Sequence, residues 1–168
     1  ELEQEEWQLV RECMDEALDK CIDYRKQEGT SMEKDFRSRI GELVKLLSSI
    51  DPYQNRRIEK IKERLKEALE KTKEDFEADP NRFEQEVVYY LEKLDITEEK
   101  NRLKHHLDYF LEIVDKEEAS GKKLNFVLQE MIREINTIGA KANDSDIQRS
   151  VVQMKDEVEK IREQIMNV

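Results

Sequence analysis

The chain has 168 residues, of which 42% are charged and 37% hydrophobic, and its formal net charge is −11. It has no run of about 18 apolar residues, so the sequence predicts no membrane span, and it lacks the basic-then-apolar opening of a secretion signal. Apolar residues at helical spacing with few glycines and prolines exclude a disordered linker, and the acidic balance argues against a general nucleic-acid binder.

Apolar spacing predicts charged helices along the first 94 residues. They are expected over 2–27, 31–50, 53–76 and 82–94. Gly29 is the expected stop of the first helix and Pro52 marks the end of the second. Asp79 and Pro80 break the pattern before the fourth.

Three further helices are predicted in the second half. The first follows a cap at Asp95 or Thr97 and runs to about Glu118, the second follows a turn at Gly121, and the third follows a turn at 143–146. No strand-like alternation occurs. We therefore expect an all-α fold of about seven helices, an elongated multi-helix bundle or an arm-like array. Residues 1–94 would form an arm or scaffold and 95–168 the functional region, unless both form one continuous domain.

The two cysteines, Cys13 and Cys21, lie eight residues apart on one predicted helix, too far apart to form a disulfide within it. We expect reduced core thiols in a cytoplasmic protein. Because the chain opens at Glu1 in an acidic helical pattern, we also expect it to be a piece of a longer protein.

The helix around 124–141 is strongly two-sided. Its apolar side is expected to hold Leu124, Val127, Leu128, Met131, Ile135 and Ile138, and its opposite side Lys123, Glu130, Arg133, Glu134, Thr137 and Lys141. Gln129 and Asn136 lie on the flank of the polar side. A solvated helix face with surface ion pairs explains the same pattern, so the polar side alone does not establish a site.

A second polar stripe lies on the preceding helix. It consists of Asp95, Glu99, Arg102 and His106, at offsets of four, three and four. Imidazole and carboxylate groups are natural metal ligands and proton carriers near neutral pH. A charged rim without chemistry is the competing interpretation, since one stripe does not make a metal site.

Charge is distributed unevenly along the chain. Residues 1–120 hold 33 acidic and 22 basic side chains, whereas 121–168 hold eight of each. The second region is therefore the least repulsive toward phosphate, although it is no basic patch. Affinity for nucleic acid would come from a few placed side chains, from another domain, or from repetition in an oligomer.

Long segments of the chain resemble the C-terminal region of the YicC/YloC family of bacterial endoribonucleases. The segments are GKKLNFVLQEMIREINTIGAKAND at 121–144, VVQMKDEVEKIREQIMNV at 151–168 and RFEQEVVYYLEKLDITEEKNRLKHHLDYF at 82–110. The resemblance covers nearly the whole chain and is weakest over 40–81. His106 matches the family pattern. The departures are His105, Asn125, Ile132, Ala140 and Met166.

The resemblance implies a cytoplasmic endoribonuclease that depends on a divalent cation, Mn²⁺ or Mg²⁺, and that carries a further N-terminal domain. It implies RNA as substrate, a homo-oligomer with a hexamer as the suggested state, and other RNA-decay proteins as further partners. The residues hypothesised to act are His106 as acid or base, Glu99, Glu130 and Glu134 as metal or proton ligands, and Arg102, Arg133, Lys141, Gln129 and Asn136 as RNA and phosphate contacts.

A second function stays open at this stage. The chain could be a non-catalytic oligomerisation scaffold or adaptor for RNA decay, with the polar side serving as a subunit contact. Substitution of Arg133 and Glu134 would then abolish assembly, whereas on the enzyme hypothesis it would stop cleavage and leave assembly intact.

Overall fold

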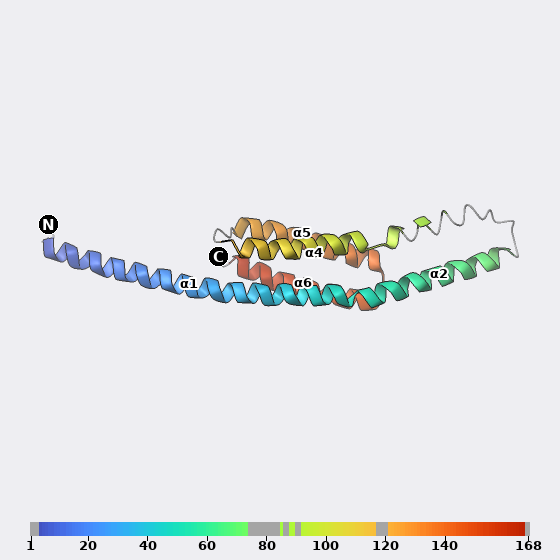
Figure 1. Cartoon of the computed structure of the whole chain (residues 1–168), viewed down its shortest axis with the longest axis horizontal. Helices are drawn as coiled ribbons and strands as arrows, with labels where there is room; N and C mark the ends of the chain where they lie inside the picture. The colour runs from blue at the N-terminus through green and yellow to red at the C-terminus, as the bar shows by residue number, and fades with distance from the viewer. Residues whose placement is uncertain (1–3, 74–84, 86–87, 90–91, 117–120, 167–168) are drawn as a thin grey trace. The chain divides into compact units, whose positions relative to one another are not determined.

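The computed structural model describes residues 4–73, 85, 88–89, 92–116 and 121–166. Its main elements are α1 (Gln4–Ser49), α2 (Asp51–Lys73), α4 (Thr97–Val114), α5 (Gly121–Ala142) and α6 (Ser145–Met166) (Figure 1). No strand occurs within these described ranges. The predicted all-α class is therefore confirmed.

The expectation of about seven helices was wrong. The predicted helices 2–27 and 31–50 are one helix, α1, which continues through Gly29. Gly29 has no left-handed backbone conformation that would end a helix, and a glycine inside a helix costs only about 1 kcal/mol relative to alanine. Pro52 lies in the first turn of α2, where a missing N–H is tolerated. Most of the predicted helix 82–94 lies outside the described residues.

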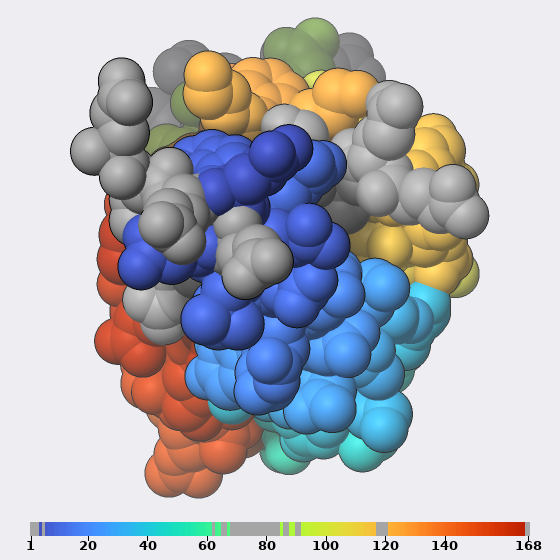
Figure 2. Space-filling model, turned by 90° about the vertical axis from the view of Figure 1, so that its left-hand side faces the viewer, coloured from blue at the N-terminus to red at the C-terminus, as the bar shows by residue number. Residues whose placement is uncertain are grey.

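The chain divides into two compact units, Glu1–Ser38 and Arg39–Val168. The boundary predicted at residue 94 stays a prediction. The first unit is the N-terminal part of α1, whose surface is the blue one in Figure 2. Its exposed apolar side chains are Trp7, Leu9, Val10, Met14, Leu18, Ile22 and Tyr24. Cys13 and Cys21 are free and exposed, so the expectation of core thiols was wrong.

The second unit has a core in which α4 packs along α5 and α5 packs along α6. The buried side chains of α5 include all six predicted for its apolar side, which confirms that part of the pattern. They are Leu124, Val127, Leu128, Met131, Ile135 and Ile138. The matching stripe of α6 consists of Ile147, Val151, Met154, Val158, Ile161 and Ile165. Spacings of three and four residues place each stripe on one helix face.

The turn between α5 and α6 has local causes in the sequence. Asn143 adopts a left-handed conformation, with φ of 41°, which asparagine tolerates better than most residues. Asp144 Oδ1 then accepts hydrogen bonds from the backbone N–H groups of Asp146 (2.9 Å) and Ile147 (3.2 Å), so it caps α6. The two helices also approach closely before the turn, where a Cβ at Gly139 would lie 3.1 Å from Val151 Cγ1, so the valine side chain would have to shift by a few tenths of an ångström.

None of the helices within the described residues combines the length and apolar character needed to cross a membrane.

Candidate metal-binding site between α4 and α5

Polar contacts at successive turns set the register of α4 against α5. Lys141 Nζ lies 2.6 Å from Glu99 Oε1, and Arg102 Nη1 lies 4.0 Å from Glu134 Oε1. Residue numbers rise along α4 while they fall along α5. The two helices are therefore antiparallel, and the two stripes predicted from the sequence face each other.

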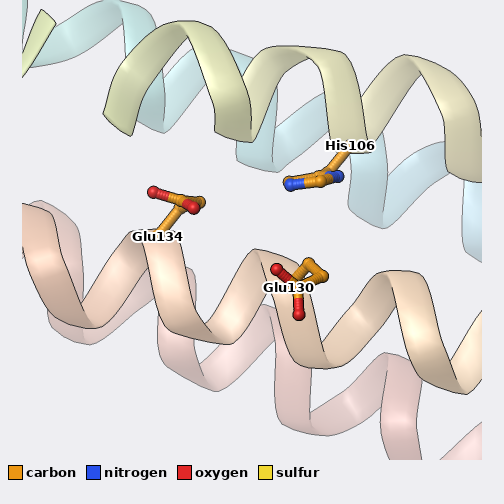
Figure 3. Close-up of side chains that lie close together, drawn as sticks. All are labelled: His106, Glu130 and Glu134. Carbon is orange, nitrogen blue, oxygen red and sulfur yellow. The ribbon is translucent and has the colours of Figure 1, made fainter. Parts of the chain in front are cut away.

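The next turn brings His106 of α4 to Glu130 and Glu134 of α5. One potential ligand atom from each side chain lies within 4.8 Å of the other two. In Figure 3 the imidazole of His106 and the carboxylate of Glu134 project into the space between the helices, and Glu130 lies in front of the α5 ribbon below His106. His106 and Glu130 are half-buried and Glu134 is buried. Sequence reasoning named all three residues as candidates.

The chemistry of this donor set fits a divalent cation. Carboxylate oxygens suit Mg²⁺ and Mn²⁺, and an imidazole nitrogen is accepted by Mn²⁺. A small cation held by few protein ligands keeps several water molecules, and the partial exposure of His106 and Glu130 leaves water access on one side. Three protein donors are thus a suitable set for Mn²⁺.

The position of Glu134 on α5 differs from the prediction, which placed it on the polar side opposite the core. It is only 4% exposed, because it lies at the edge of the helix face that packs against α4 rather than opposite the core. A buried carboxylate needs a compensating charge. The guanidinium of Arg102 is 4.0 Å away, and a bound cation would compensate the same carboxylate.

The candidates for RNA contact other than Lys141 are exposed side chains of α4 and α5. Arg102 pairs with Glu98 one turn away, and Arg133 Nη1 lies 3.6 Å from Glu130 Oε2. The side chain of Arg133 is 70% exposed. Gln129 and Asn136 are exposed as well. Arg102 and Arg133 are therefore accessible from solvent beside the potential ligands, whereas Gln129 and Asn136 are accessible elsewhere on α5.

Glu99 and Lys141 are brought to each other and not to the potential ligands. The Glu99 carboxylate is buried; Oε1 pairs with Lys141, and Oε2 has no hydrogen-bond partner. Lys141 also donates a hydrogen bond to the backbone carbonyl of Asp95 (3.3 Å). Within the described residues, Glu99 does not join the group formed by His106, Glu130 and Glu134.

Sequence reasoning missed Arg57 of α2. Its side chain contacts the segment just before α4 and the last turn of α5. One guanidinium nitrogen donates to the carbonyl of Leu94 (2.9 Å) and to that of Lys141 (2.8 Å). Burial lowers the pKa of Arg57, while the charges of Asp144 and Asp95 oppose this shift. The sequence analysis did not single out Arg57, which stands in a strongly charged helix. Its spacing places it on the same face as Ile50 and Gln54, which the structure shows to be buried, but spacing alone does not predict the contacts of that face.

Asp95 forms the turn that leads into α4. Its Oδ1 accepts hydrogen bonds from the hydroxyl of Thr97 (2.6 Å) and from the backbone N–H of Thr97 (3.1 Å). The hydroxyl contact is the main reason why the pKa of Asp95 is lowered, and the nearby charge of Lys141 acts in the same direction. The turn, Arg57 and Lys141 together fix where α4 begins relative to the end of α5.

The fold and this group of side chains define an all-helical protein with a candidate cation site between two antiparallel helices. Residues 50–168 match the family model described as endoribonuclease YicC-like, C-terminal. The chain belongs to this family.

Two curated relatives show the same relationship over more of the chain. A protein named probable endoribonuclease YicC from Clostridioides difficile (strain 630) is 36% identical over 163 residues, covering 96% of this chain and 56% of the relative. A protein of the same name from Haemophilus influenzae (strain ATCC 51907 / DSM 11121 / KW20 / Rd) is 31% identical over 154 residues, covering 92% of this chain and 53% of the relative. The chain thus spans about half the length of both.

Proposed function

We propose that this chain is the C-terminal helical part of an endoribonuclease that uses a divalent cation to cleave RNA phosphodiester bonds. The observation that carries the proposal is the convergence of His106, Glu130 and Glu134 between α4 and α5. The family description and the names of both relatives support the activity at the level of the family.

In the proposed mechanism, Glu130 and Glu134 would hold the cation, which when bound would supply positive charge to the phosphate and its attacking oxygen. One ring nitrogen of His106 lies within 4.8 Å of an oxygen of each carboxylate, so a proton that it accepts or donates would be exchanged beside the reacting phosphate; in this role that nitrogen takes the proton and the carboxylates alone would hold the cation. Cleavage requires removal of a proton from a 2′-hydroxyl or a water, and return of a proton to the leaving oxygen. His106 carries one of these two transfers.

The arginines would bind and stabilise the phosphate. Arg102 and Arg133 are exposed at the rim, and their guanidinium groups match the charge that develops on phosphate oxygens. Gln129 and Asn136, exposed elsewhere on α5, would offer hydrogen bonds to sugar or base there. Lys141 is paired with Glu99, so we assign this pair to holding the helix ends in place rather than to metal or phosphate binding.

Self-association is part of the proposal. The first unit exposes a series of apolar side chains, among them Trp7 at 58% and Leu9 at 64%. Apolar surface of this kind on a helix fits an interface with other subunits. A hexamer as the state of this homo-oligomer, contact with other RNA-decay proteins and a cytoplasmic location are proposed from the chain's membership of the family. This surface also favours the second candidate, a non-catalytic scaffold for RNA decay.

The two candidates are separated by assays on the full-length protein that contains this chain. Cleavage of structured and single-stranded RNA is measured with Mn²⁺, with Mg²⁺ and with a chelator. We expect His106→Ala and Glu134→Gln each to lower the cleavage rate by about 100-fold or more. His105→Ala and Glu112→Gln are matched controls, because both residues are exposed on α4.

Assembly of the same variants is followed by light scattering. Unchanged assembly with lost cleavage supports the enzyme. Lost assembly in a variant that combines Arg133→Ala with Glu134→Gln supports the scaffold instead. Full cleavage rates in both His106→Ala and Glu134→Gln remove these residues from the mechanism.

A further inference from the structure

Two aromatic side chains are exposed near the candidate metal site and have no place in the mechanism above. Phe126 of α5 is 68% exposed and Tyr109 of α4 is 46% exposed. Full burial of a phenylalanine side chain contributes roughly 1.5–3 kcal/mol, which Phe126 forgoes. Each ring therefore presents an apolar face to solvent on a helix that contributes to the site.

The register of α4 and α5 places both rings beside the potential metal ligands. Residue numbers rise along α4 as they fall along α5, from Glu99 with Lys141 to Arg102 with Glu134, and His106 then meets Glu130 and Glu134 four residues further along α4 than Arg102. After His106 and Glu130, the next step reaches Tyr109 and Phe126. At about 1.5 Å per residue, Tyr109 lies about 4.5 Å along the axis from His106, and Phe126 about 6 Å from Glu130. Both rings are therefore within about one helical turn of the potential metal ligands.

Cations accompany the rings on the same rims. Arg133 lies seven residues after Phe126, and Arg102 lies seven residues before Tyr109, so each shares a helix face with its ring. Both arginines are exposed, with side-chain exposures of 70% and 53%. Lys122 and Lys123, also exposed, precede Phe126 in the first turn of α5.

Aromatic rings interleaved with cations are the arrangement that binds single-stranded nucleic acid. The cations follow the phosphates, and the rings stack on bases that are not paired to another strand. A base inside a duplex has both faces covered and cannot stack in this way. The positive side chains also favour RNA over a second protein surface as the occupant of this rim.

We propose that Phe126, assisted by Tyr109, stacks on an unpaired base next to the phosphate bound at His106, Glu130 and Glu134, so that the site takes single-stranded segments of RNA. The proposal rests on the proposed function, since it places the base relative to the reacting phosphate. Phe126 contacts substrate away from the reacting atoms, and it therefore contributes to substrate affinity and specificity.

The test measures binding and cleavage by the full-length protein with substitutions at Phe126. Binding of a single-stranded oligoribonucleotide is measured by fluorescence anisotropy with Mn²⁺ present, in a His106→Ala background that should not cleave it. We expect Phe126→Ala and Phe126→Leu to weaken binding by about tenfold, because leucine keeps apolar bulk but cannot stack, and Phe126→Trp to retain it. In cleavage assays the same variants should raise KM more than they lower kcat. Val152→Ala, at an exposed position on α6, is the matched control.

An abasic substitution in the RNA identifies the stacked base. An abasic site is placed at each position around the cleaved bond in turn. At one position it should weaken binding to the wild type by about tenfold and cause no further loss in Phe126→Ala, because the two changes remove the same contact. Independent losses at every position overturn the proposal.

The outcomes separate this proposal from the function on which it rests. If the wild type cleaves RNA and Phe126→Ala binds single strands as tightly as the wild type does, stacking is overturned while the endoribonuclease proposal stands. If no divalent cation supports cleavage, the proposed function fails and stacking next to a reacting phosphate fails with it. Altered assembly with unchanged RNA affinity makes Phe126 a subunit contact and likewise overturns stacking.

Discussion

Replacing Lys141 by methionine tests the ion pair that links α4 to the end of α5. The Glu99 side chain is 7% exposed, and its Oε1 lies 2.6 Å from Lys141 Nζ, while its Oε2 has no hydrogen-bond partner. Without Lys141 the buried carboxylate would lose its only close counter-charge within the described residues. Removing one partner of a buried pair costs about 3–5 kcal/mol.

The exposure of Lys141 favours the lower end of this range. Its side chain is 33% exposed, so water can replace part of the lost interaction, and we expect a loss of about 3 kcal/mol in the free energy of unfolding. At about 2–4 °C per kcal/mol for a protein of this size, the melting temperature should fall by about 6–12 °C. Urea unfolding followed by circular dichroism measures the free energy, and a thermal scan measures the midpoint.

Two comparisons make this prediction specific. Arg133→Met removes an exposed partner at 3.6 Å and should cost less than about 1 kcal/mol. Glu99→Leu combined with Lys141→Met removes both charges and should recover most of the stability lost in Lys141→Met. The reasoning is refuted if Lys141→Met costs no more than Arg133→Met, or if the double variant is less stable than Lys141→Met.

Three further perturbations follow from the same contacts. Gly139→Ala should destabilise the protein by about 1–2 kcal/mol, because its Cβ would meet Val151 Cγ1 at 3.1 Å. Gly41 has open space around it, so Gly41→Ala should be neutral or stabilising in the same urea titration. Equal effects of the two substitutions on stability would contradict the packing argument. Arg57→Met leaves the carbonyls of Leu94 and Lys141 without their donor and should cost about 3 kcal/mol, and an unchanged urea midpoint would show that the guanidinium is not needed there. Because hydrogen bonding from Thr97 lowers the pKa of Asp95, the charged carboxylate stabilises the fold above about pH 4, and this contribution is lost as the pH falls through the lowered pKa. Asp95→Asn should thus be costly at neutral pH and cost less in strong acid, and a pH-independent cost measured by urea unfolding contradicts this assignment.

The helical class and the buried face of α5 could be predicted because both depend on local spacing. The helix number could not, since whether Gly29 ends a helix depends on whether the chain finds packing contacts or a turn there. The burial of Cys13 and Cys21 could not be predicted either. Apolar spacing predicts which residues share a helix face, but it leaves open whether another element covers that face.

The candidate site was predictable in its residues but not in its pairings. His106, Glu130 and Glu134 could be named from two polar stripes, yet the register of α4 against α5 decides which carboxylates reach the imidazole. That register assigns Glu99 to Lys141 and buries Glu134. Arg57 was missed because its partners are backbone carbonyls of residues 37 and 84 positions away, and no sequence pattern encodes such contacts.

The most direct test of the account is the position of Mn²⁺ in crystals of the full-length protein, located by its anomalous scattering. The account predicts a peak coordinated by the carboxylates of Glu130 and Glu134 and adjacent to the imidazole of His106, and loss of that peak in Glu134→Gln. Manganese bound elsewhere in the protein, with these three side chains free of metal at saturating concentration, would contradict it.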